Sequence, residues 1–234
     1  MSGMGLVLIL AESAIELVPP ELTKHPSVLK LAEKRGKKPN EILLDRSYHH
    51  AAMRSLKEAE KRGRPDIFHT TLLELLGTPL NREGLLQTYV HTVDNRVVEI
   101  DSNVRLPVNY DRFVGLLEQL YAVGRVPEAG EPLLAIRKQT LNQLLGEIKP
   151  STTVAFTTLG EYEDLGRLFE ELAKERKPAI LIGGFPHGHF SKETLNLADM
   201  AVRFDKEALE AWVVASRAVY AYELAIGLPK HRLR

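Results

Sequence analysis

The sequence of 234 residues contains no cysteine, which excludes disulfide scaffolds, thiolate zinc sites and cysteine nucleophiles. Long hydrophobic runs are also missing. The apolar run near the start, Leu6 to Ala11, is far shorter than the ~20 residues that a membrane-spanning helix needs. It has neither the basic flank nor the small-residue cleavage site of a signal peptide. We therefore expect a soluble, cytoplasmic protein with no membrane partner.

A net charge is absent too, because 31 basic side chains balance 31 acidic ones. The charges are nevertheless unevenly placed. Residues 24–64 contain 12 Lys/Arg and 5 Asp/Glu, whereas residues 160–175 contain 2 Lys/Arg and 6 Asp/Glu. A positive region on a neutral protein can bind phosphate, since attraction depends on the local potential. The alternative is a solvated surface whose helix faces differ in charge, so neutrality alone does not exclude a nucleic-acid partner.

Hydrophobic residues make up 44% of the chain, enough to bury a full core, and the length fits one large domain. Strand-forming and helix-forming runs alternate, which is typical of an α/β fold with a parallel sheet. The predicted strands are 5–10, 42–45, 86–92, 96–100, 133–136, 153–157 and 178–182. The predicted helices are 25–35, 47–62, 65–76, 110–121, 163–175 and 204–225. We predict one domain over 1–228, with a β-hairpin in an inserted region at about 80–104, and a frayed basic tail at 229–234.

A glycine-rich loop, Gly183 to Phe190, follows the last predicted strand. Gly183, Gly184 and Gly188 allow backbone to come close to a ligand, at the strand end where open α/β sheets bind ligands. The loop matches neither the dinucleotide-binding pattern nor the phosphate-loop pattern. A glycine-rich turn without a ligand is the alternative interpretation.

Histidine occurs in two pairs, His187 with His189 in this loop and His49 with His50 near the N-terminus. A metal site would need further ligands, and cysteine is not available to supply them. We therefore expect no metal.

Arg64 and Asp66 stand on either side of Pro65, which opens a predicted helix. An arginine at this place can hold a phosphate or a carboxylate through two hydrogen bonds. Asp66 can equally be an ordinary acid in the first turn of a helix, where negative charge is favoured.

A second polar motif is RLPVNYDR, residues 105–112. Arg105, Arg112, Asn109 and Tyr110 around one turn suit phosphate positioning and base stacking. The same residues fit an asparagine-capped helix with solvated arginines and a tyrosine packed into the core.

Five segments, taken in order, resemble the Nep1/Emg1 family of ribosome-biogenesis proteins, which are SPOUT-class RNA methyltransferases. The segments are LLDRSYHHAAM (43–53), RGRPDIFHTTLL (62–73), RLPVNYDRFVGLLEQL (105–120), ILIGGFPHG (180–188) and LEAWVVASRAVYAYE (209–223). The resemblance covers about residues 5–227, and the compact length resembles archaeal members.

The resemblance implies a fold and a cofactor. Members of the family have an α/β domain whose C-terminal part is tied in a deep trefoil knot, a rare topology. S-adenosylmethionine binds bent in that knot, held by the end of a strand, the glycine loop and the turn that enters the last helix. The corresponding residues here are Thr157, Thr158, Leu159, Gly183, Gly184, Gly188, Leu209, Glu210, Ala211, Trp212, Val213 and Val214.

The resemblance also implies partners. Family members act as homodimers through helices packed at the knot, and they methylate N1 of a pseudouridine in a loop of small-subunit ribosomal RNA. The RNA-binding positions correspond to Arg64, Arg105, Val108, Asn109 and Arg112. Many relatives carry an arginine at the position of Val108, so one possible phosphate contact is missing here.

The implied reaction makes specific demands on the site. N1 of pseudouridine must lose its proton, so the enzyme needs in-line positioning and a base or an anion-stabilising group. Asp66, positioned by Arg64, is the candidate base; in the other interpretation Arg64 contacts RNA and Asp66 only holds it. Without cysteine, methyl transfer should be direct. Two alternative functions stay open: an RNA-binding small-subunit assembly factor, and methylation of another RNA such as transfer RNA.

Overall fold

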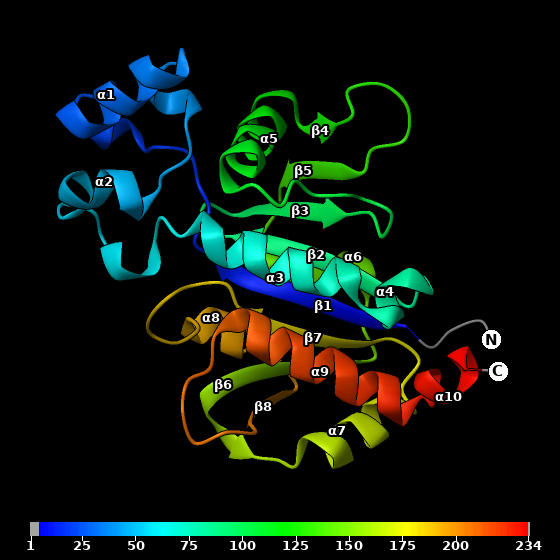
Figure 1. The fold of residues 1–234 in the computed structure, drawn as a ribbon. Coiled ribbons are helices and arrows are strands. Elements are labelled where there is room, and N and C mark those ends of the chain that lie inside the picture. The colour runs from blue at the N-terminus through cyan, green and yellow to red at the C-terminus, as the bar shows by residue number, and fades with distance from the viewer. Residues whose placement is uncertain (1–4, 234) are drawn as a thin grey trace.

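An eight-stranded sheet runs through residues 5–233, the part of the chain that the computed structural model describes (Figure 1). Its strand order is β4-β5-β3-β2-β1-β7-β6-β8. The strands are β1 (Leu6–Ser13), β2 (Leu86–Thr92), β3 (Arg96–Ile100), β4 (Arg125–Val126), β5 (Leu134–Lys138), β6 (Thr152–Tyr162), β7 (Pro178–Gly183) and β8 (Met200–Arg203).

The sheet has a parallel half and an antiparallel half. Strands β2, β1, β7, β6 and β8 pair in parallel, whereas β2, β3, β5 and β4 pair antiparallel. The prediction of a parallel sheet is therefore right for one half and wrong for the other. The predicted hairpin at 86–100 forms, but β2 also pairs directly with β1, so its strands are integral parts of the main sheet.

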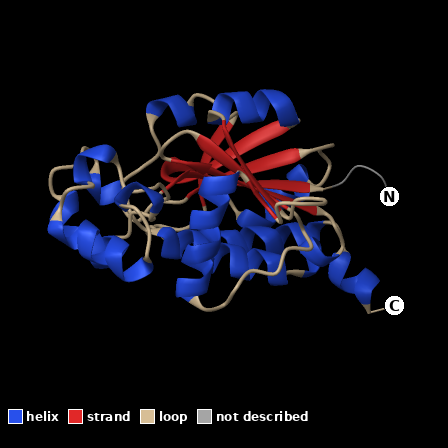
Figure 2. Ribbon diagram, turned by 90° about the horizontal axis from the view of Figure 1, so that it is seen from above, coloured by secondary structure: helices blue, strands red, loops and turns tan. Residues whose placement is uncertain are grey.

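Helices cover both faces of the sheet (Figure 2). They are α1 (Pro26–Arg35), α2 (Arg46–Met53), α3 (Pro65–Gly77), α4 (Pro79–Arg82), α5 (Tyr110–Val123), α6 (Leu141–Ile148), α7 (Leu165–Leu172), α8 (Lys192–Leu195), α9 (Ala211–Ala225) and α10 (Leu228–Arg232), with short 3-10 turns η1 (Pro20–Leu22), η2 (Pro39–Glu41) and η3 (Ala59–Lys61).

Strand β1 explains the layers, because successive side chains of a strand point to opposite faces. Leu6, Leu8 and Leu10 join the larger core with α3, α5, α7 and α9. Val7 and Ile9 join the smaller core with α6 on the other face. A strand buried on both faces has to be continuously apolar, which is why this segment shows no alternation of polar residues.

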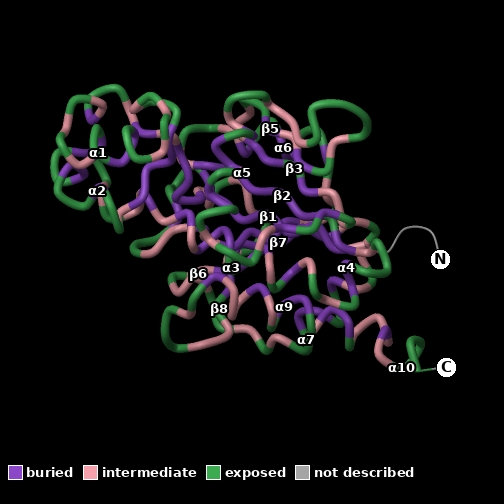
Figure 3. The backbone as a smooth tube through the Cα atoms, turned by 45° about the horizontal axis from the view of Figure 1, so that its top comes forward, coloured by how far each residue is buried: buried purple, intermediate pink, exposed green. Residues whose placement is uncertain are grey.

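The segment between β1 and α3 forms a separate N-terminal lobe, residues 17–62, beside the sheet (Figure 1). It has its own small core, and its outer turns are exposed while the central strands are buried (Figure 3). The lobe is attached to α5 by Glu118, which is 3% exposed and accepts hydrogen bonds from Arg35 (2.7 Å), Lys37 (2.8 Å) and the backbone N–H of Leu43 (3.1 Å). Removing one partner of such a buried charged cluster is strongly destabilising.

Two predicted elements in the lobe are wrong. Residues 42–45 are buried but form only one bridge, between Leu17 and Leu43. The predicted helix 47–62 ends at Met53, because the chain turns back so that Arg46 N–H can bond the carbonyl of Gly63 (2.9 Å). This hydrogen bond joins segments that are apart in the sequence, so the periodicity of apolar residues does not reveal it.

The C-terminal part departs from prediction in its boundaries. Helix α9 begins at Ala211, and residues 204–210 form an irregular connection from β8, with bends at 204–207, instead of helix. Strand β6 continues to Tyr162, five residues past its predicted end, and the predicted helix 163–175 is observed as α7, which is shorter at both ends. Residues 229–232 of the tail predicted to fray instead lie in α10, which begins at the buried Leu228, and Arg232 pairs with Glu83 at 3.5 Å. The last residue of that tail, 234, lies outside the described residues.

The sequence pattern does not predict helix α6, helix α8 or strand β8. A readable signal exists for α6, since Thr140 and Gln143 form a capping box at its start. Strand β8 has four residues and α8 has a single turn, and elements this short carry little periodicity.

Candidate functional site

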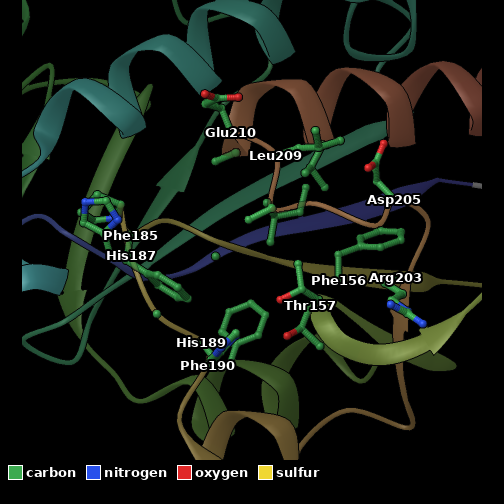
Figure 4. Close-up of a pocket in the computed structure, with 18 of the residues that line it drawn as sticks. Phe156, Thr157, Phe185, His187, His189, Phe190, Arg203, Asp205, Leu209 and Glu210 are labelled. Atoms are coloured by element: carbon green, nitrogen blue, oxygen red, sulfur yellow. The ribbon is translucent and has the colours of Figure 1, made fainter.

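A cavity of about 570 Å³ opens at the carboxyl ends of β6 and β7, beside β8 (Figure 4). Figure 4 shows labelled side chains from three segments surrounding one open space. The lining comprises Phe156, Thr157, Thr158, Ile182, Gly183, Phe185, Pro186, His187, Gly188, His189, Phe190, Val202, Arg203, Phe204, Asp205, Glu207, Ala208, Leu209, Glu210, Ala211, Trp212 and Val214, with Ile67 of α3 and Arg64, the residue just before α3. Carboxyl ends of parallel strands are the usual ligand site of open α/β sheets.

The first segment of the lining is a bulge in β6. The pairing of β6 with β8 shifts between Phe156 and Glu161, so the intervening residues leave the ladder. Thr157 and Thr158 line the cavity, whereas Leu159 lies outside the lining and is 63% exposed. Gly160 has to be glycine here, because a Cβ would lie 2.5 Å from the backbone nitrogen of Val202.

The second segment is the glycine loop after β7. Gly183 and Gly188 line the cavity, and Gly188 has a φ of +88°, which favours glycine. Gly184 lies outside the lining and packs against Ser13, where a Cβ would approach the hydroxyl to 2.2 Å. Its N–H bonds the carbonyl of Ala11 at 2.8 Å, so Gly184 anchors the loop to the end of β1. The resemblance assigns all three glycines to the cofactor site. In the structure Gly183 and Gly188 line the cavity, whereas Gly184 does not.

The third segment runs from the end of β8 into α9. Leu209, Glu210, Ala211, Trp212 and Val214 line the cavity, and Val213 does not. The N-terminal turn of α9 therefore borders the cavity, where the helix dipole favours a negative group.

Sequence reasoning misses several lining residues. Phe156 comes just before the β6 residues that we expected to hold the cofactor, and Phe204, Asp205, Glu207 and Ala208 fall within the predicted long helix. Three of the missed lining residues are charged: Arg203, Asp205 and Glu207. Because residues 204–210 are predicted as helix, sequence reasoning does not identify the charged residues among them as lining residues. His189 could have been identified, because it falls in the glycine loop.

Arg64 and Asp66 form a bidentate ion pair at the edge of the cavity. Arg64 Nε lies 2.8 Å from Oδ1 of Asp66, and Nη2 lies 2.7 Å from Oδ2. The hydrogen bond to Asp66 raises the pKa of the Arg64 guanidinium above its usual value. Arg64 lines the cavity and Asp66 does not. The pair stands at the start of α3, whose first residue, Pro65, is buried.

The second polar motif lies next to this pair but outside the lining. Ring nitrogen Nε2 of His69, one turn along α3 from Asp66, is 2.7 Å from the carbonyl oxygen of Pro107. His69 also stacks on Phe113 with ring centroids 4.1 Å apart. These contacts hold the motif 105–112 against α3.

Within this motif, the side chains divide into capping and solvated ones. Asn109 caps α5 by accepting the N–H of Arg112 at 3.0 Å, as the alternative interpretation expected. Arg105 and Arg112 are exposed, and neither forms an ion pair within residues 5–233. Val108 is 80% exposed. The motif thus presents two solvated cations and one apolar side chain.

Tyr110 has a structural role. Its hydroxyl donates to Oδ2 of Asp45 at 2.6 Å, and burial raises its pKa well above the ordinary value. The other carboxylate oxygen of Asp45 caps α2 by accepting the N–H of Ser47 at 2.8 Å. Tyr110 therefore joins α5 to the lobe, and the half-buried ring is not free for stacking on a base.

The positive charge of the lobe is partly engaged in the fold. Of the 12 basic residues within 24–64, six form ion pairs: Arg35, Lys37, Lys38, Lys61, Arg62 and Arg64. The other six contribute to the surface potential, so the exposed excess of charge is smaller than composition suggests.

No three His, Asp or Glu side chains among residues 5–233 lie close enough to hold a metal ion. His49 is buried and accepts the N–H of Asp45 at 3.0 Å, while His187 and His189 line the cavity. Across the same described range, the helices are too short or too polar to cross a membrane.

Comparison with known proteins gives a consistent result over nearly the whole chain. The family model for the EMG1/NEP1 methyltransferase matches residues 8–223. The ribosomal RNA small subunit methyltransferase Nep1 of Staphylothermus marinus is 44% identical over 217 residues, which is 92% of this chain and 94% of that protein. The Pyrobaculum islandicum protein of the same name is 45% identical over 225 residues, 95% of this chain and 100% of its own length.

A solved structure agrees. The crystal structure of Archaeoglobus fulgidus Nep1 bound to S-adenosylhomocysteine has 35% sequence identity and a TM-score of 0.84, and the match covers 96% of this chain and 99% of that one. The chain belongs to the EMG1/NEP1 methyltransferase family.

Proposed function

We propose that this protein transfers a methyl group from S-adenosylmethionine to N1 of a pseudouridine in a loop of small-subunit ribosomal RNA. The observation that carries the proposal is the cavity at the carboxyl ends of β6 and β7, in a chain whose fold matches a Nep1 bound to S-adenosylhomocysteine. The names of its relatives supply the RNA class.

The cavity suits the proposed cofactor in size and chemistry. Its volume of about 570 Å³ lies within the range of small-molecule sites. Phe156, Phe185 and Phe190 offer apolar surface for a purine, and Asp205 and Glu207 offer acceptors for hydroxyl and ammonium groups. When bound, the cofactor supplies an electrophilic methyl on a positively charged sulfur, and a site that excludes water favours a step in which this charge disappears.

We assign Arg64 to RNA contact and Asp66 to holding Arg64. Both carboxylate oxygens of Asp66 already accept hydrogen bonds from the guanidinium. A role as general base requires the pair to open first, and we keep that role as the alternative for the proton on N1. Arg64 reaches from the cavity edge, so it can bind the RNA beside the reacting base.

We assign the RNA backbone to Arg105 and Arg112, whose charges are exposed next to α3. Asn109 supports the loop through its helix cap. Phosphate contacts of this kind orient the RNA, while the splayed-out base enters the cavity.

The proposal includes a SPOUT-type trefoil knot and a homodimer. In support of the knot, β8 lies outside β6 although β7 intervenes in sequence, and Gly160 packs on the backbone of Ala201 and Val202. In support of the dimer, α7 and α9 leave a groove in which Tyr220 and Leu224 are more than half exposed. The absence of cysteine suits a reducing compartment, and we place the reaction in the cytoplasm.

The test is a methyl-transfer assay with labelled S-adenosylmethionine and two loop RNAs that differ only in pseudouridine or uridine at one position. Label in the pseudouridine RNA alone supports the proposal. Equal labelling of both RNAs, or no labelling by protein that binds the cofactor, contradicts it.

A second function, as a small-subunit assembly factor, is favoured by the arginines that lie outside the cavity. A bulky residue at Gly183, in the cavity wall, should abolish cofactor binding, because it would occupy cavity space and a Cβ would already lie 2.8 Å from the ring of Phe185. Cells that assemble subunits normally with this variant, but not with Arg105→Glu and Arg112→Glu, would show that assembly is the main role.

A further inference from the structure

The glycine loop has little backbone support of its own. Gly184 fixes its start, through its N–H on Ala11 and its carbonyl on the N–H of Ala14, both at 2.8 Å. Beyond it, residues 185–190 line the cavity, yet no backbone–backbone hydrogen bond joins them to any part of residues 5–233. Their position therefore depends on side-chain contacts: Phe190 of the loop is buried in the smaller core, and the other contacts come from side chains elsewhere.

Lys61, in η3 of the lobe, makes further contacts with this loop. Its ammonium donates to the carbonyl oxygen of His189 and lies 4.8 Å from the ring centroid of Phe185. Its stem packs so closely on Gly188 that a Cβ there would lie 3.0 Å from Lys61 Cε. One side chain thus contacts three of the six residues 185–190 through three kinds of interaction.

Glu12, near the end of β1, completes the arrangement. Its Oε2 lies 3.5 Å from Lys61 Nζ, and its Oε1 accepts the N–H of Ser191 at 2.8 Å. Glu12 has a φ of +50°, an uncommon conformation for a residue with a Cβ. The carboxylate both orients Lys61 and fixes the far end of the loop.

Lys61 does not itself line the cavity, but it stands in a segment that reaches Arg64. Arg62 pairs with Glu16 at 2.5 Å, and the N–H of Arg64 bonds the carbonyl of Ala14 at 2.9 Å. Residues 61–64 therefore lie along the end of β1, with the loop contact at one end and the Arg64–Asp66 pair at the other. In Figure 1 the loop after β7 passes next to the chain between α2 and α3.

We propose that Lys61 is a positioning residue for the cofactor: it fixes loop 183–190 in the shape that binds S-adenosylmethionine. This inference rests on the proposed function, because it takes the cavity as the cofactor site. Lys61 acts through the loop, without touching the cofactor.

The first experiment follows the loop without any cofactor. Hydrogen exchange is measured at the amides of residues 185 and 187–191, since Pro186 has no N–H, in the wild type, in Lys61→Met and in Lys57→Met. Lys57 is an exposed lysine of the same lobe with no ion pair within residues 5–233, so its substitution removes the same charge without touching the loop. We expect faster exchange at Ser191 and its neighbours in Lys61→Met alone. Equal exchange in all three proteins would overturn the proposal.

The second experiment measures binding of S-adenosylhomocysteine by calorimetry. We expect about 10-fold weaker binding in Lys61→Met, in line with loss of one charge-assisted hydrogen bond. Lys57→Met should bind as the wild type, and Lys61→Arg, which keeps the charge, should recover most of the affinity. In turnover, KM for the cofactor should rise while KM for RNA and kcat at saturating cofactor stay unchanged.

The outcomes separate the two proposals. Wild-type affinity in Lys61→Met, or equal loss in Lys57→Met, overturns the role of Lys61 while the cofactor site stands. A wild-type protein that binds no S-adenosylhomocysteine contradicts the proposed function, and the exchange experiment still decides whether Lys61 holds the loop.

Discussion

The guanidinium of Arg64 holds both carboxylate oxygens of Asp66, with Nε 2.8 Å from Oδ1 and Nη2 2.7 Å from Oδ2. The two residues stand at the start of α3, and only Arg64 faces the cavity. The carboxylate thus fixes the direction of a cation that would otherwise rotate freely. This relationship links the protein's fold to its proposed contact with RNA.

The first prediction tests this link by a double-mutant cycle. If Asp66 positions Arg64, Asp66→Asn should weaken RNA binding about as much as Arg64→Ala, and the double variant should add little, because coupled residues are not additive. RNA affinity is measured by filter binding or fluorescence anisotropy. The alternative role gives a different pattern: a general base removed in Asp66→Asn would lower kcat by about 10²- to 10⁴-fold with RNA affinity intact.

The second prediction concerns Gly184. A Cβ at this position would lie 2.8 Å or less from Ser13, so Gly184→Ala should destabilise the protein by about 1–3 kcal/mol, as overpacking does, and displace the start of the loop. Chemical denaturation and S-adenosylhomocysteine binding measure the two effects.

The matched control is Gly146, in α6, where a Cβ would meet nothing within 4 Å. Gly146→Ala should leave stability unchanged or raise it by about 0.5–1 kcal/mol, since alanine favours helix. Gly184→Ala with unaltered stability would mean that the contact between the loop and β1 is looser than described.

The third prediction is a pH dependence of stability. Burial lowers the pKa of both His49 and His91 below the ordinary value of 6.5. Each therefore binds a proton less readily in the folded state than in the unfolded state. Their contribution to stability is fully present above about pH 6.5 and is lost as the pH falls through that value towards the folded pKa.

We expect the free energy of unfolding to fall below pH 6.5 by at most about 1.4 kcal/mol per pH unit for each proton taken up. Denaturation at a series of pH values measures the slope. His91→Gln should make it shallower, whereas His50→Gln, at an exposed position, should not. A slope unaffected by His91→Gln would show that this histidine is not the source.

The fourth prediction concerns Val108, which is 80% exposed beside Arg105 and Arg112. Val108→Arg should strengthen RNA binding without changing stability, because the new charge joins an exposed cationic surface. The slope of log K against log salt should steepen by about 0.7–0.9 for one added phosphate contact. An unchanged slope would place the RNA elsewhere on the surface.

Local signals explain which parts of the fold are predictable from sequence. His25 and Gly36 bound α1 as expected, because a capping side chain and a left-handed glycine act within one turn. The hairpin from β2 to β3 is predictable for the same reason. The partner of β2 on its other side, β1, is 80 residues away in sequence by register (Leu6 with Leu86), and no local pattern reveals it.

The candidate site is predictable in part for a similar reason. The glycine loop and the start of α9 are contiguous motifs, and the cavity brings them together. The irregular segment 204–210 is not predicted from the sequence, since its apolar and charged residues also fit helical spacing. The loop is also contacted by side chains that are distant in sequence: Ser13, Glu12 and Lys61. These contacts arise only in the tertiary fold and could not be predicted from local sequence.

The most direct test of the account is the position of the methyl group. The protein is incubated with labelled S-adenosylmethionine and a pseudouridine-containing loop RNA of the small subunit, and the digested nucleosides are separated and identified by mass spectrometry. We predict label in N1-methylpseudouridine, and none when the same RNA carries uridine at that position. Label in another nucleoside, or equal label in the uridine RNA, would contradict the account.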